Sequence, residues 1–119
     1  MKQHGRLVLV LPDKEFTFDH NRPITSLAHL IEDYNNQTTE SDTTHFEEVI
    51  AMHDFKYDAF VKSKEDLIER THLNIENRAV HHHVFNLGLI KELLIYCGFE
   101  MVHQQTYPPF HLVSVAQKK

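Results

Sequence analysis

Hydrophobic and polar residues follow patterns that predict three strands. Leu7-Val-Leu-Val-Leu is a continuous apolar run, typical of a strand buried on both faces of a sheet. Near the C-terminus, two further strand-like runs flank Pro108-Pro109. Because so few residues join these two runs, they must pair antiparallel. We therefore predict a small three-stranded mixed sheet with strands at about 6–12, 99–107 and 110–116.

Apolar residues spaced three or four apart predict two helices in the first half of the chain. The first carries Leu27, Leu30, Ile31 and Tyr34 on one face, with Thr25 as its N-cap. The second is expected to begin at a capping box formed by Thr44 and Glu47 and to bury Phe46, Val49 and Ile50, with His53 on the same stripe. A polar linker at 35–42 separates the two.

Two more helices are predicted before the final strands. One is expected to begin at Ser63 and to bury Leu67 and Ile68. The other is expected to begin after the N-cap Asn86 and to end at Cys97, which we expect to be a small buried residue. Gly98 then ends the helix in a left-handed conformation. The alternation at 80–85 also allows a short extra strand there. The predicted fold class is α/β, one domain over residues 1–119 with about four helices.

Composition narrows the functional classes. At 41% hydrophobic and 24% charged residues, the chain has the make-up of a soluble globular protein with no membrane span. A net charge of −5 with scattered Lys and Arg argues against nucleic acid as a partner. One cysteine and no signal peptide favour the cytoplasm.

Eleven histidines are many for 119 residues, and three of them are consecutive. On a strand, His81 and His83 would point to the same face and could chelate zinc with a third ligand from elsewhere, such as His20, His29 or His45. The alternative is that both are hydrogen-bonded structural residues. We favour this alternative, because no second closely spaced ligand pair accompanies them.

A second group of candidate residues lies on and before the first helix. His29 and Asp33 are four residues apart and can touch on a helix, either as a general base with its orienting carboxylate or as an ordinary surface pair, which we favour. Arg22 could recognise a carboxylate or phosphate, or could tie the loop to Asp13 or Asp19. Asp13 follows the first strand, where α/β sheets place ligands.

Two segments carry a family resemblance. Residues 5–34, with the run from Pro12 to Thr25, and residues 81–102 resemble the C-terminal half of class I S-adenosylmethionine (SAM) dependent methyltransferases. The resemblance implies a Rossmann-like arrangement, with the last strand between the other two, and a small-molecule methyl acceptor. It also implies an acceptor site drawn from Asp13, His20, Arg22, His29, Asp33, His81 and His83.

The Gly-rich SAM loop of that family has no counterpart here. The only glycines are Gly5, Gly88 and Gly98, and the last two fall in and at the end of a helix. We therefore expect no cofactor bound by this chain alone, with SAM implied only by resemblance. No residue is identified as catalytic, and the sequence does not select the methyl acceptor.

Three functional interpretations stay open. The first is a substrate-side half of a methyltransferase-like domain, inactive alone. Either its missing N-terminal half comes from another chain, or it is a remnant without activity. The second is a non-catalytic interaction module, because the bare edge of Leu7–Leu11 favours a homodimer. The third is a small metal-binding protein that uses its histidines.

Overall fold

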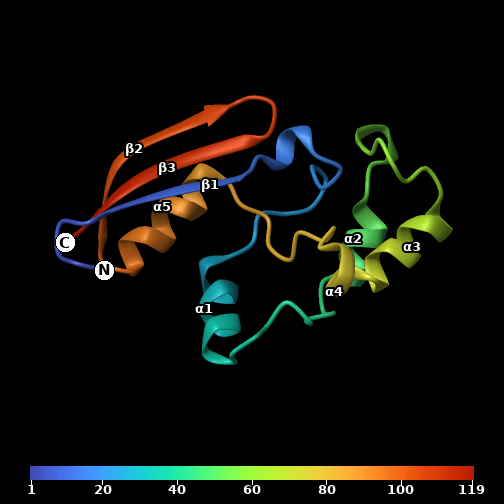
Figure 1. The fold of residues 1–119 in the computed structure, drawn as a ribbon, viewed down its shortest axis with the longest axis horizontal. Helices are drawn as coiled ribbons and strands as arrows, with labels where there is room; N and C mark the ends of the chain where they lie inside the picture. Colours follow the sequence, from blue (N-terminus) through green and yellow to red (C-terminus); the bar gives the residue numbers. More distant parts are fainter.

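A computed structural model describes residues 1–119 as a mixed α/β fold (Figure 1). It contains a three-stranded sheet, five α-helices and two short 3-10 turns. None of the helices combines the length and apolar character needed to span a bilayer. In chain order the elements are β1 Arg6–Pro12, η1 Lys14–Phe16, α1 Leu27–Asn35, α2 Phe46–Met52, η2 Phe55–Tyr57, α3 Lys64–His72, α4 Asn74–Asn77, α5 Leu87–Tyr96, β2 Phe99–Tyr107 and β3 His111–Lys118.

The sheet has the order β1-β3-β2, so the last strand lies in the middle as predicted. Both outer strands pair with β3 antiparallel, with Val8 opposite Val115 and Phe99 opposite Lys118. The prediction of a mixed sheet is therefore wrong, because both hydrogen-bonded strand pairs are antiparallel. The two strands that run parallel, β1 and β2, are separated by β3 and share no hydrogen bonds.

One face of the sheet carries the core beneath α5. Ile90 and Leu94 of α5 are buried against Leu112 and Ala116 of β3. The opposite face has no covering helix (Figure 1), and the side chains of Val8 and Val10 are 59% and 55% exposed. The prediction that the first strand is buried on both faces is therefore wrong for this chain, because only alternate residues of β1 face α5.

The first backbone N–H groups of a helix have no partner within the helix, so the residue whose side chain accepts from them marks where the helix begins. Ser63 and Asn86 cap α3 and α5 as predicted. Helix α1 is instead capped by Ser26, because Thr25 pairs with the backbone of Val84. The predicted capping box of α2 does not form, since the Thr44 hydroxyl donates to Asp42.

Several other details differ from the prediction. Residues 80–85 form no strand, because their backbone groups pair with Arg22 and Thr25 rather than with a neighbouring strand. Gly98 takes the left-handed conformation (φ 84°), but Cys97 before it is exposed rather than buried. His53 is buried as expected, and its Nε2 atom lies 3.1 Å from the Asp58 carboxylate. The fifth helix is α4, a single turn that the pattern did not predict.

Figure 1 shows the sheet and α5 on one side and α2, α3 and α4 on the other. Helix α1 lies below. The loop that follows β1 leads to α1, and the residues after α1 lead to α2. The segment at 78–86, which we call the crossing segment, returns from α4 to α5. This arrangement brings side chains from α1, from the start of α2 and from the crossing segment to one place.

Candidate metal centre

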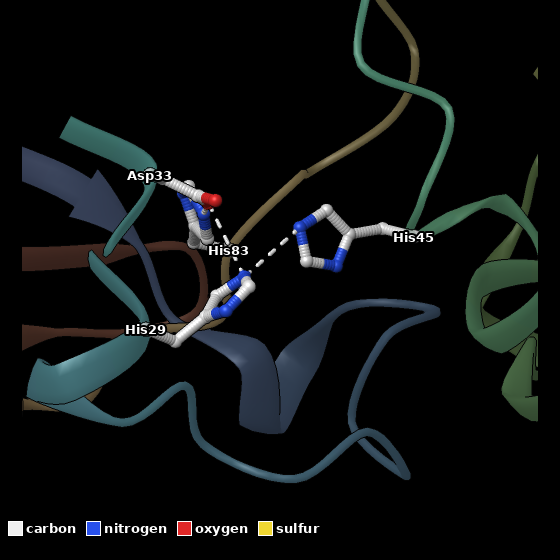
Figure 2. Close-up of side chains that lie close together, drawn as sticks. All are labelled: His29, Asp33, His45 and His83. Carbon is white, nitrogen blue, oxygen red and sulfur yellow. Dashed lines mark hydrogen bonds and ion pairs between the residues drawn. The ribbon is translucent and has the colours of Figure 1, made fainter. Parts of the chain in front are cut away.

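Four side chains converge between α1, α2 and the crossing segment (Figure 2). Helix α1 contributes His29 and Asp33, the residue before α2 is His45, and the crossing segment contributes His83. The Asp33 Oδ2 atom lies 2.6 Å from His83 Nε2 and 3.2 Å from His29 Nε2. His29 Nε2 lies 3.4 Å from His45 Nε2. Three imidazoles and one carboxylate therefore point toward a common centre.

Local structure places each of these groups. Residues four apart on a helix face the same side, so α1 presents His29 and Asp33 together. His45 is held at the start of α2 with its Nε2 atom 3.6 Å from the Asp42 carboxylate. His83 reaches Asp33 across 50 residues of sequence. None of the four is fully exposed, and none is fully buried.

The spacing of the four groups suits a small divalent cation. One donor atom from each residue can be chosen so that all lie within 4.8 Å of one another. Zinc bonds nitrogen and oxygen at about 2.0–2.1 Å, so a tetrahedral zinc site has ligand atoms about 3.3 Å apart. The distances between Asp33, His29 and His45 are already close to that value. The Asp33–His83 distance is shorter, at 2.6 Å, and all pairs lie within 4.8 Å.

The protonation state of His45 also favours metal binding at this site. Burial, reinforced by the neighbouring His83 ring, lowers the pKa of His45 below its ordinary value. Burial lowers the pKa of His82 in the same way. A lowered pKa keeps the imidazole neutral, and the neutral ring is the form that binds metals.

The predicted chelating pair, His81 with His83, is not formed. The two side chains engage different carboxylates, because the segment is not a strand. His81 Nδ1 lies 2.7 Å from Asp19 Oδ2, whereas His83 pairs with Asp33. Burial raises the pKa of Asp19, but its hydrogen bonds with His81 and Arg22 outweigh this effect and keep the pKa below its ordinary value.

Arg22 holds this region together from within. It is 1% exposed, and its guanidinium donates to Asp19 at 3.2 Å and to Glu48 at 3.0 Å. It also donates to the backbone carbonyls of His81 at 2.6 Å and His82 at 3.3 Å. Of its two predicted roles, the geometry supports the tie to Asp19, since no donor is left facing solvent.

The remaining candidates lie outside the cluster. Asp13 is buried and accepts a hydrogen bond from the backbone of Glu15 at the start of η1. His20 pairs with Asp54 at 2.7 Å. Of the seven predicted site residues, the structure brings together three: His29, Asp33 and His83. The fourth, His45, entered the sequence analysis only as one of three alternative third ligands.

Comparison of the chain with family models, with curated proteins and with solved structures finds no match. The resemblance to methyltransferases stays a prediction from the residue pattern. The functional argument therefore rests on the contacts described above.

Proposed function

We propose that the protein binds one divalent metal ion, zinc by preference, through His29, Asp33, His45 and His83. The observation that carries the proposal is the convergence of these four ligand atoms within 4.8 Å. Imidazole suits zinc, and four nitrogen or oxygen ligands in a compact group suit its tetrahedral coordination. Magnesium and calcium prefer sites built from oxygen alone.

The number of protein ligands favours a structural ion over a catalytic one. Catalytic zinc sites generally keep one position open for water, whereas structural sites take four protein ligands. Here four ligands come from three separate segments. A metal ion would therefore fasten α1, the start of α2 and the crossing segment to one another. Because the unfolded chain has no such site, metal binding would add to the stability of the fold.

Zinc titration of metal-free protein, purified without a nickel column, tests the proposal. We expect one zinc ion per chain with sub-micromolar affinity, measured by competition with a chromophoric chelator. Zinc at about 100 times its Kd should add about 2.7 kcal/mol to the free energy of unfolding. Magnesium is the control and should leave the unfolding transition unchanged. An absence of saturable zinc binding, or equal stabilisation by magnesium, would contradict the proposal.

A second candidate function is the substrate-side half of a methyltransferase-like domain. It is supported by the β1-β3-β2 order, which agrees with the arrangement that the resemblance implies, and by the uncovered sheet face beside β1. Gly88 within α5 and Gly98 at its end cannot form a Gly-rich cofactor loop. The partner would be a missing N-terminal half or a second copy joined along β1. With Cys97 a free thiol, we place the protein in the cytoplasm.

Titration calorimetry with SAM and with its demethylated product, beside a measurement of solution mass, tests this second candidate. We expect no binding by the chain alone and the mass of a dimer at micromolar concentration. Micromolar binding of SAM would show that the argument from the missing loop is wrong. A strict monomer would remove the dimer and leave only a different chain as the partner.

A further inference from the structure

A cavity of about 250 Å³ lies at the end of β1, between the loop that follows it and the crossing segment. Its apolar wall is formed by Leu11, Pro12, Val84 and Phe85. Its polar wall is formed by Lys14, Thr17, Asp19, His81, His82 and His83. An apolar wall that faces polar groups able to fix a ligand's orientation is a feature of small-molecule sites.

The Asp19–His81 pair is the most highly organised polar feature of this wall. Asp19 is 2% exposed and ionised, so the Nδ1 atom of His81 donates to it at 2.7 Å. The ring of Phe18 stacks on His81, with an interplanar angle of 13°, and Arg22 fixes the His81 carbonyl. The Nε2 atom on the other side of the ring makes no hydrogen bond within the protein. The side chain that carries it is 37% exposed.

The other side chains of the polar wall are largely engaged. The Lys14 ammonium donates to the carbonyls of His20 and Arg22, and the Thr17 hydroxyl donates to the carbonyl of Lys14. The charges nearby also balance. Of the residues that line the cavity, Lys14 carries one positive charge and Asp19 one negative charge. A balanced wall favours an uncharged ligand over an ion.

We propose that this cavity binds a small uncharged alcohol or phenol. The hydroxyl group donates a hydrogen bond to His81 Nε2, and the apolar body of the ligand packs against Leu11, Val84 and Phe85. Asp19 and Arg22 act as positioning residues that fix the ring and its free nitrogen. The cavity shares His83 of its wall with the metal centre, but the hydrogen-bond acceptor of the proposed site is His81, which is not among the metal ligands.

A pair of ligands matched in shape tests the proposal. p-Cresol and toluene differ only in the hydroxyl group, and their binding can be followed by NMR of the imidazole nitrogens in the unmodified protein. We expect p-cresol to bind about fivefold more tightly than toluene, as one hydrogen bond predicts. The Nε2 resonance of His81 should shift with p-cresol and stay unchanged with toluene. Equal affinities, no binding of either compound, or a shift confined to other histidines would overturn the proposal.

Two variants complete the test. His81→Phe keeps an aromatic ring against Phe18 but removes the acceptor, and it should bind the two compounds equally. His20→Phe is the matched control. His20 forms a similar pair with Asp54, at a distance of 2.7 Å, but it does not line the cavity. The His20→Phe variant should keep the preference for p-cresol. If this variant lost the preference, the proposal would also be overturned. The p-cresol titration is repeated in the presence of zinc and in the presence of chelator. Its outcome can then be distinguished from the outcome of the zinc-binding test.

Discussion

Replacing Arg22 with methionine is expected to lower the free energy of unfolding by about 3–5 kcal/mol. Methionine fills a similar volume but supplies none of the hydrogen bonds that the guanidinium makes. Asp19, which is 2% exposed, would keep His81 but lose its permanent positive partner. The carbonyls of His81 and His82 would lose their donor as well. A buried charge without its partner costs far more than an exposed one.

Urea denaturation followed by circular dichroism measures this loss, with the midpoint and slope fitted together. Arg78→Met is the matched control, because Arg78 pairs with Glu40 at an exposed position. Exposed ion pairs contribute about 0–1 kcal/mol, so this variant should unfold close to the unmodified protein. If the Arg22 variant lost no more stability than the Arg78 variant, Arg22 would not hold the crossing segment.

Features that depend on neighbouring residues could be predicted from the sequence. The strands at both ends follow from runs of alternating or continuous apolar residues. The order of the strands is confirmed too, but it came from the family resemblance and not from neighbouring residues. Asn86 and Gly98 marked the ends of α5, because capping and left-handed closure are decided within one turn of helix. Thr25 failed as a cap for the opposite reason. Its hydroxyl is taken by Val84, 59 residues away.

The candidate site depends on such distant contacts. The pair of His29 and Asp33 could be predicted, because both lie on one helix. The pairing of His83 with Asp33 could not, because it follows from the path of the crossing segment rather than from spacing. Treating that segment as a strand placed His81 and His83 on one face, whereas Arg22 binds its carbonyls and the two rings turn to different carboxylates. The contacts of one buried side chain therefore explain why the prediction for two histidines was wrong.

Removing one ligand of the metal centre should weaken metal binding more than a substitution outside the four ligands. We expect His83→Ala to weaken zinc binding by about 100-fold or more. Structural zinc sites gain about 10–16 kcal/mol from four ligands, so each ligand accounts for a few kcal/mol. His83 is the ligand that connects the crossing segment to α1. Its loss should therefore remove the stabilisation by zinc together with most of the affinity.

The consecutive histidines supply a closely matched control. His81→Ala changes the same residue type two positions away, in the same segment, but removes a partner of Asp19 rather than a metal ligand. Zinc affinity should then change by less than about threefold, because all four ligands remain. Competition with a chromophoric chelator measures both affinities, and the unfolding midpoint with and without zinc gives a second readout. If the two variants lost zinc equally, the histidine-rich segment would be binding metal without a defined site, and the four-ligand geometry would not be the reason for binding.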